Sequence, residues 1–296
     1  MPKVFHVTAV CVPEKHYMVN LDSRLRKIKA LVDDGSYFTV NRARQYGKTT
    51  TLLALEQFLQ AEYAVVFIDF QTISSAKFQN EHTFSTAFAK EFLRGLKGAA
   101  PAKDNAYEKA VRIFAENVSQ SQASYELPEL FEDLREVCAT ADKPLVLILD
   151  ETDQAADHQV FLDFLAQLRA GYIRRAIQPA FWSVILAGVY DIKNLKRKFR
   201  TDETHHFNSP WNIAADFTVE MGFSEDDIAG MLLEYESDYH TGMDVRQMAE
   251  LVYHYTCGYP YLVSRLCKLM DEEVSMQKAF GTKSAVWTKR GLLEAV

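Results

Sequence analysis

Short apolar runs alternate with longer helical patterns through most of the chain. Several of the runs are almost continuous in Val, Ile, Leu or Phe, with few polar positions between. Such continuity is typical of strands that are buried on both faces of a parallel sheet. The pattern predicts five strands: Tyr37–Asn41, Ala64–Asp69, Leu145–Asp150, Ser183–Gly188 and Phe217–Met221.

Apolar residues with helical spacing fill the stretches between these strands. They predict helices over residues 49–60, 83–97, 104–118, 126–140 and 158–176. Strands that alternate with helices predict βαβ units, and therefore a three-layer α/β fold around a mostly parallel, five-stranded sheet.

The pattern changes near residue 222, after which nearly every segment has helical periodicity. Ser224, followed by three acids, is a good helix start, because its hydroxyl can cap the first turn and the acids complement the dipole. Further helices are predicted over residues 244–256, 260–276 and 286–296. We therefore expect an α/β core over residues 1–222 and a small helical lid over 223–296. Because the chain ends within a helical pattern, this lid is either truncated there or its last helix frays.

Composition narrows the class of protein. The chain has 296 residues, of which 48% are hydrophobic and 25% charged, as in an ordinary globular protein. The formal net charge of −7 argues against a protein that coats nucleic acid, although a local basic patch stays open. The apolar runs are too short to cross a bilayer, so we expect a cytoplasmic protein without a membrane partner.

The strongest chemical signal is a Gly-Lys-Thr sequence between a predicted strand and a predicted helix. Strand, loop, Gly-Lys-Thr and helix is the context in which a P-loop binds phosphate, through backbone N–H groups that surround the anion. The residues expected to bind nucleotide here are Arg42, Ala43, Arg44, Gln45, Tyr46, Gly47, Lys48, Thr49 and Thr50.

Within this loop the side chains have distinct expected roles. Lys48 supplies a positive charge to the β- and γ-phosphates, and the Thr49 hydroxyl binds Mg²⁺. Gly47 lets the backbone approach the phosphate closely. Arg42 stands where the P-loop pattern has its first glycine, and arginine disfavours positive φ. The loop must therefore begin in a different conformation or accept strain.

A second signal is the pair of acids that ends the third predicted strand. Five apolar residues precede Asp150 and Glu151. In P-loop nucleotide hydrolases an acid at such a strand end holds Mg²⁺, and an adjacent glutamate polarises the attacking water. Asp150 is predicted to do the first and Glu151 the second. The alternative is a strand that merely ends in surface acids.

Together these motifs resemble the AAA-like ATPases of bacteria, which are close to the STAND class of signal-transduction ATPases. The resemblance covers the chain from Tyr17 to Pro260. It implies that ATP or ADP is bound with Mg²⁺, that hydrolysis is slow, and that the nucleotide switches conformation. It also implies that arginine is tolerated at position 42 and that Gly258-Tyr259-Pro260 lies against the nucleotide, with Pro260 in contact. Adenine specificity, a homo-oligomer and an effector partner follow from the resemblance alone.

Other assignments left alternatives open. Asp69 either orients Glu151 or caps a loop, Arg265 either reaches the γ-phosphate or is a surface cation, and Tyr17 with Met18 forms either an adenine wall or core. The basic run 193–200 is a solvated helix, a nucleic-acid contact or the source of an arginine finger. The candidate finger and sensor residues are Arg197, Arg200, Tyr190 and Asp191.

The sequence leaves the overall function with three main interpretations, and a fourth, a small-molecule kinase, is disfavoured because Asp150-Glu151 supplies its own water-activating acid. The first is a Mg²⁺-dependent ATPase that acts as a nucleotide-controlled switch. The second is a binding module that holds a nucleotide without turning it over, which the arginine at position 42 favours. The third is an ATPase that helps remodel DNA, for which the basic run is the support and the acidic net charge the objection.

Overall fold

The computed structural model describes residues 3–96, 105–120, 124–189 and 211–296. The chain forms two compact units, each made of segments that are distant in sequence. The helical unit contains Met1–Arg26, Arg44–Thr51 and Val219–Val296, and the sheet unit contains Lys27–Ala43 and Leu52–Thr218. The two units are described separately below.

The sheet unit is built around four parallel strands in the order β1-β4-β3-β2. These strands have the bounds that the apolar runs predict. Every residue of β3 and β4 is buried, which explains why their sequences are apolar at successive positions. The strands are β1 (Tyr37–Asn41), β2 (Ala64–Asp69), β3 (Leu145–Asp150) and β4 (Ser183–Gly188).

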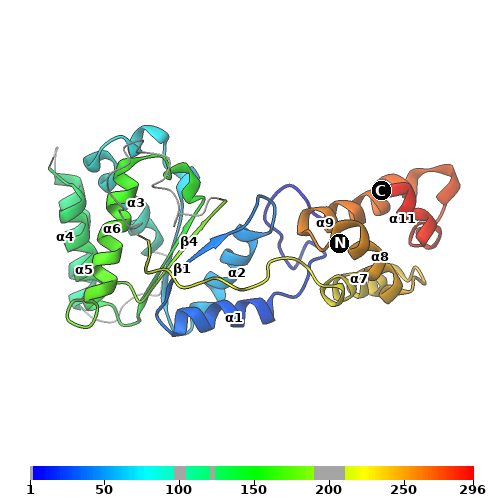
Figure 1. Cartoon of the computed structure of the whole chain (residues 1–296), viewed down its shortest axis with the longest axis horizontal. Helices are drawn as coiled ribbons and strands as arrows, with labels where there is room; N and C mark the ends of the chain where they lie inside the picture. Colours follow the sequence, from blue (N-terminus) through cyan, green and yellow to red (C-terminus); the bar gives the residue numbers. More distant parts are fainter. Residues whose placement is uncertain (1–2, 97–104, 121–123, 190–210) are drawn as a thin grey trace, which may run out of the picture. The chain divides into compact units, whose positions relative to one another are not determined.

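Helices cover both faces of this sheet, which gives the three layers expected from the alternating pattern (Figure 1). On one face, aromatic side chains of α3, α4, α5 and α6 form a continuous core with alternate residues of the strands. The other face is covered by α2 and the carboxyl-terminal part of α1 (Figure 1). The helices are α1 (Asp22–Asp33), α2 (Lys48–Leu59), α3 (Glu81–Leu96), α4 (Asn105–Gln120), α5 (Leu127–Thr140) and α6 (Gln159–Arg174).

The prediction of a fifth strand at Phe217–Met221 is wrong. On the side of β1 that does not pair with β4, the described residues hold only a single parallel bridge, between Phe38 and Ala215. Farther along, the Glu220 carboxylate accepts the backbone N–H groups of Met221 and Gly222, at 2.9 and 2.8 Å. A side chain thus takes donors that a strand would use in its ladder, so the extended segment does not become a strand.

The helical unit contains α7 (Glu225–Tyr239), α8 (Val245–Thr256), α9 (Pro260–Lys268), α10 (Lys283–Val286) and α11 (Lys289–Ala295). Ser224 caps α7 in a reciprocal capping box with Asp227, as the sequence indicates. The predicted helix over 260–276 is α-helical only to Lys268 and then continues through a π turn at Leu269–Glu273 and a 3₁₀ turn.

The amino-terminal segment completes the core of the helical unit. Phe5 and Tyr17 are buried against Tyr235 and Trp287, with ring centroids of Phe5 and Tyr17 5.0 Å apart. The Tyr17 hydroxyl donates to Asp238 at 2.6 Å. Tyr17 is therefore a core residue, the second of the two roles that the sequence left open.

The sheet topology determines where a functional site forms in the sheet unit. Because all four strands are parallel, their carboxyl ends lie at one edge, which is where ligands bind in open α/β sheets. Asn41, Gly188 and Asp150 end β1, β4 and β3, and these three strands are neighbours. Among the described residues, no helix combines the length and apolar character needed to cross a membrane.

Candidate functional site

An acidic turn follows β3 at the carboxyl edge of the sheet. The buried strand positions Asp150, whose exposed fraction is only 1%. Glu151, the next residue, has φ of 52° and ψ of 40°, in the left-handed region that residues other than glycine rarely adopt. Backbone conformations of this kind are concentrated at functional sites. The Glu151 N–H donates to Oδ1 of Asp150 at 2.9 Å, which stabilises the sharp turn.

The acidic turn is held against the end of β4. The Thr152 hydroxyl donates to the carbonyl of Ala187 at 2.9 Å, and the Val189 N–H donates to Oδ2 of Asp153 at 2.7 Å. Gly188 allows this close approach, since a Cβ there would lie 2.9 Å from Oδ1 of Asp153. The geometry of the turn thus depends on two residues that follow the predicted acid pair.

Arg42 is anchored at the end of β1 and does not have the strained backbone that the missing glycine suggests. Its N–H donates to the carbonyl of Gly188 at 3.3 Å, and its guanidinium donates to the carbonyl of Asn41 at 3.1 Å. The guanidinium also lies 5.8 Å from the ring centroid of Phe217. Positive φ occurs later, at Gln45. The loop therefore begins in a different conformation from that of the P-loop pattern, which is one of the two outcomes that Arg42 predicts.

The loop before α2 has the backbone of a phosphate-binding turn. Gln45 and Gly47 have φ of 62° and 71°, and α2 begins at Lys48. Alternation between left-handed and right-handed residues turns successive N–H groups toward one point, which creates an anion-binding concavity at a helix amino terminus. A Cβ built at Gly47 meets no atom within 4 Å, so this side of the loop is open.

The side chains of the loop differ in their exposure to solvent. Lys48 is 6% exposed although it carries a charge, and Thr49 and Thr50 are half-buried in the first turn of α2. Ala43, Arg44 and Gln45 are exposed. Lys48 and Thr49 belong to the helical unit, whereas Asp150 and Glu151 belong to the sheet unit.

Within the helical unit, the turn between α8 and α9 contacts the loop. The Tyr259 hydroxyl donates to the carbonyl of Arg44 at 2.6 Å. The rings of Tyr259 and Tyr46 meet edge to face, with centroids 4.8 Å apart. On the amino-terminal segment, the Cys11 N–H donates to Oγ1 of Thr50 at 3.3 Å. These three contacts hold the loop against the rest of the helical unit.

The turn that presents Tyr259 has little freedom. Cys257 and Gly258 both have positive φ, of 49° and 70°. The Phe223 N–H donates to the carbonyl of Gly258 at 2.8 Å, and Pro260 is buried at the first position of α9, where its missing N–H costs nothing. Pro260 therefore fixes the turn, and its contact with a nucleotide stays a prediction.

Replacing Gly258 with alanine is expected to destabilise the helical unit. A Cβ there would lie 2.0 Å from the carbonyl oxygen of Phe223, and φ is left-handed. The strain of the left-handed backbone and the overlap of the Cβ together predict that the free energy of unfolding falls by about 2–4 kcal/mol. The measurement is the midpoint of urea unfolding followed by circular dichroism.

Gly230→Ala is the matched control for that change. Gly230 lies in α7, where a Cβ would meet no atom within 4 Å, so alanine should stabilise the helix by up to about 1 kcal/mol. Equal unfolding midpoints for the two variants would contradict the assigned role of Gly258.

The remaining sequence candidates have structural roles where they are described. Asp69 accepts the N–H of Gln71 at 2.8 Å and caps a 3₁₀ turn, which is the loop-cap alternative. Arg265 pairs with Glu273 at 3.4 Å on the surface of the helical unit. The candidate sensor and finger residues Tyr190, Asp191, Arg197 and Arg200 lie outside the described residues.

Three features of the candidate site escaped prediction. Nothing in a sequence window shows that Gln45 has positive φ or that Tyr259 reaches the Arg44 carbonyl. A role for Asp153 was easier to predict, because an additional acid two residues after Glu151 is visible in the sequence. Its bond to Val189 depends on β3 and β4 being neighbours, which only the topology shows.

Solved structures share this fold at low sequence identity. The Walker-type ATPase PABY2304 of Pyrococcus abyssi has a TM-score of 0.59 and 16% identity, over 98% of this chain and 77% of that protein. ORC1 of Aeropyrum pernix, solved in complex with DNA, has a TM-score of 0.52 and 10% identity, over 94% of this chain and 65% of that protein. ORC2 of the same organism, in ADPNP and ADP complexes, has a TM-score of 0.51 and 11% identity, over 98% of this chain and 69% of that protein.

These likenesses establish the α/β fold that the sequence predicts. The chain spans slightly less than two thirds of the ORC1 structure. No protein of curated function matches the sequence. A family model described as an AAA-like domain matches residues 8–286, which include the loop, the acidic turn and the helical segments. The chain therefore belongs to the AAA-like domain family.

Proposed function

We propose that this protein is a Mg²⁺-dependent ATPase that works as a nucleotide-controlled switch. The observation that carries the proposal is the loop before α2, with left-handed residues at Gln45 and Gly47, open space at Gly47 and a buried lysine at the helix start. A helix amino terminus already attracts anions, and the backbone of this loop directs further N–H groups to the same place.

In this proposal the triphosphate of ATP is bound by the loop and by Lys48. Backbone N–H groups of residues 43–50 bind the β-phosphate, and the ammonium group of Lys48 interacts with the β- and γ-phosphates as a point charge. Burial of the lysine strengthens this attraction because water screens it less.

Thr49 and Asp150 supply the kind of ligands that Mg²⁺ prefers. Mg²⁺ is commonly bound by a hydroxyl, one or two carboxylates and phosphate oxygens, so a cluster of several acids is not required. Among the described residues no group of three or more His, Cys, Asp or Glu side chains could hold a metal ion. When bound, Mg²⁺ neutralises charge on the phosphate oxygens.

Glu151 is the proposed general base. Its carboxylate accepts a proton from the attacking water while the water oxygen bonds to the γ-phosphorus. The bond from that phosphorus to the β–γ bridging oxygen breaks, and ADP leaves with the electron pair, so the products are ADP and inorganic phosphate. The left-handed backbone and the contacts of Thr152 and Asp153 fix the direction in which Glu151 leaves the strand.

The switch follows from the contact between Tyr259 and the loop. A bound phosphate that repositions the Arg44 carbonyl would act directly on the turn that begins α9, because the two are hydrogen-bonded. Occupation of the loop would therefore bias the arrangement of the helical unit, as a ligand with different affinity for two states must do. An effector partner or a second copy of the chain would respond to that change.

Phosphate release by the purified chain tests the proposal. With ATP and Mg²⁺ we expect slow turnover that disappears when EDTA removes the metal. Nucleotide binding without phosphate release, even at high protein concentration, would favour the alternative of a nucleotide-binding scaffold.

A DNA-linked role is the second candidate, on the observation that residues 193–200 contain five Lys and Arg side chains. The structural relative ORC1 was solved with DNA. Binding of a labelled oligonucleotide at physiological salt that weakens steeply as the salt concentration rises would support this candidate, and the absence of binding at physiological salt would count against it.

A further inference from the structure

A cavity lies in the sheet unit, near the amino ends of β1 and β4. Its volume is about 80 Å³, and it opens between α5, α6 and the segment that leads into β4. Tyr37 begins β1 and Phe181 lies just before β4, so the cavity is at the sheet edge opposite to Asn41, Asp150 and Gly188. It is therefore separate from the proposed phosphate site.

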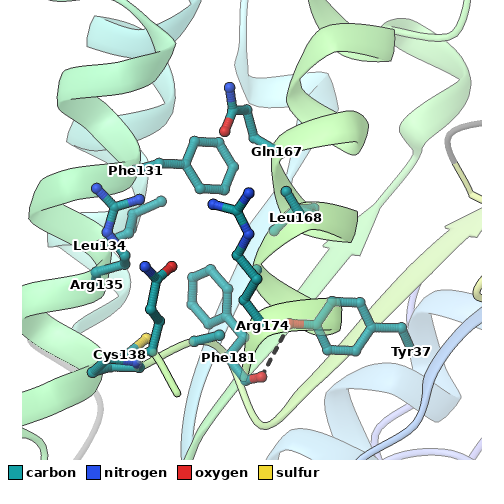
Figure 2. A pocket seen from close by; sticks show the side chains of 14 residues that line it. Tyr37, Phe131, Leu134, Arg135, Cys138, Gln167, Leu168, Arg174 and Phe181 are labelled. Atoms are coloured by element: carbon teal, nitrogen blue, oxygen red, sulfur yellow. Dashed lines mark hydrogen bonds between the residues drawn. The ribbon is translucent and has the colours of Figure 1, made fainter. Parts of the chain in front are cut away.

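The floor of the cavity is apolar and buried. Phe131 and Leu134 of α5 face Leu168 of α6 and Phe181, and all four side chains are buried (Figure 2). The Tyr37 hydroxyl donates to the carbonyl of Phe181 at 3.0 Å, so this polar group is already satisfied. An apolar group that enters the cavity would meet rings and methyl groups without losing a hydrogen bond.

The rim of the cavity is positively charged. Arg135 from α5 and Arg174 from α6 lie on the two sides of the space between these helices (Figure 2). Neither guanidinium takes part in a hydrogen bond or ion pair within the described parts of the chain. Among the residues that the structure describes, no Asp or Glu lines the cavity, and burial raises the pKa of the Cys138 thiol to about 12, so this thiol stays neutral.

Two guanidinium groups that are unpaired within the described residues lie above an apolar floor. Such a site favours a ligand that has an anionic end and an apolar end. We propose that this cavity binds a small organic anion, in which a carboxylate or phosphate contacts Arg135 and Arg174 and an apolar group no larger than one ring packs on Phe131 and Phe181. Planar guanidinium groups bind such anions through paired, charge-assisted hydrogen bonds. A closed cavity of about 150 Å³ holds benzene, so a ring is only partly enclosed here and its charged end stays at the rim.

Binding of simple probes tests this proposal. Benzoate, phenyl phosphate and the neutral benzamide are titrated into ¹⁵N-labelled protein, and chemical shifts of the Gln167, Leu168 and Phe181 amides are followed. Benzoate or phenyl phosphate is expected to shift these amides at concentrations at which benzamide does not. The comparison of the two anions shows whether carboxylate or phosphate is preferred.

Two variants of the rim complete the test. Arg135→Gln and Arg174→Gln change exposed side chains and are each expected to weaken binding of the preferred anion about 10-fold or more. Arg112→Gln, on the exposed surface of α4, is the matched control and should leave binding unchanged. Equal binding of benzamide, no shift with either anion, or unaltered affinity in both rim variants would each overturn the proposal.

Discussion

Replacing Lys48 with alanine is expected to abolish nucleotide binding while the chain stays folded. The variant removes the one lysine ammonium of the loop, at the first residue of α2, and leaves the backbone N–H groups in place. Hydrogen bonds to charged groups contribute about 1.5–3 kcal/mol each, so the loss of contacts to two phosphates should weaken binding at least about 100-fold. The measurement is a titration with a fluorescent ATP analogue in the presence of Mg²⁺.

Lys109→Ala is the control for charge. Lys109 is exposed on α4, so its replacement changes the net charge of the protein equally without touching the loop. We expect it to bind nucleotide as the parent does. Alanine is the best helix former, so both variants should keep the helical content of the parent by circular dichroism. Unaltered nucleotide affinity in Lys48→Ala would remove the loop from the site.

Replacing Glu151 with glutamine is expected to keep nucleotide binding and to stop hydrolysis. The amide has almost the shape of the carboxylate but cannot accept the proton of the attacking water. General-base catalysis contributes about 10²–10⁴-fold to rate, so phosphate release should fall by at least about 100-fold. The two measurements are phosphate release under saturating ATP and the affinity for the ATP analogue.

A second change at the same position separates chemistry from backbone strain. Because φ at Glu151 is 52°, glycine fits this backbone at least as well as glutamate. Glu151→Gly should therefore fold and bind nucleotide but fail to hydrolyse it. Glu132→Gln, on the exposed surface of α5, should hydrolyse ATP at the parent rate. Turnover by Glu151→Gln at the parent rate would show that another group activates the water.

Buried parallel strands were predictable because their environment is uniform. A strand covered on both faces is apolar at most positions, so β3 and β4 are visible as nearly continuous apolar runs with the observed bounds. The segment Phe217–Met221 alternates apolar and polar residues, which also predicts a strand, yet the N–H groups of Met221 and Gly222 bond to the Glu220 carboxylate. Hydrophobicity indicates burial, and it does not indicate which partner a backbone N–H will have.

The loop and the acid pair were predictable in identity but only partly in geometry. Gly-Lys-Thr and Asp150-Glu151 are local motifs, and the structure has the expected strand, loop and helix around them. The left-handed positions at Gln45 and Glu151 could not be foreseen, because neither residue type favours that region. They depend on tertiary contacts that hold the turn, such as those of Thr152 and Asp153 with β4.

Contacts between distant segments were beyond sequence reasoning. Hydrophobic periodicity does not indicate that Phe5 and Tyr17 belong to the core of the helical unit, or that Tyr259 contacts the loop through Arg44 and Tyr46. The cavity between α5 and α6 likewise joins residues from three separate segments, and its two arginines resemble ordinary surface cations in the sequence.

Thermal unfolding with and without Mg²⁺ and ATP tests the central claim most directly. A ligand at 100 times its Kd stabilises the folded state by about 2.7 kcal/mol, which for a chain of this length corresponds to a rise in Tm of roughly 4 °C. We expect such a rise with ATP and with ADP, a smaller one with GTP, and none for Lys48→Ala. If no nucleotide changes the Tm of the parent protein at millimolar concentration, the loop does not bind phosphate and the proposed function is wrong.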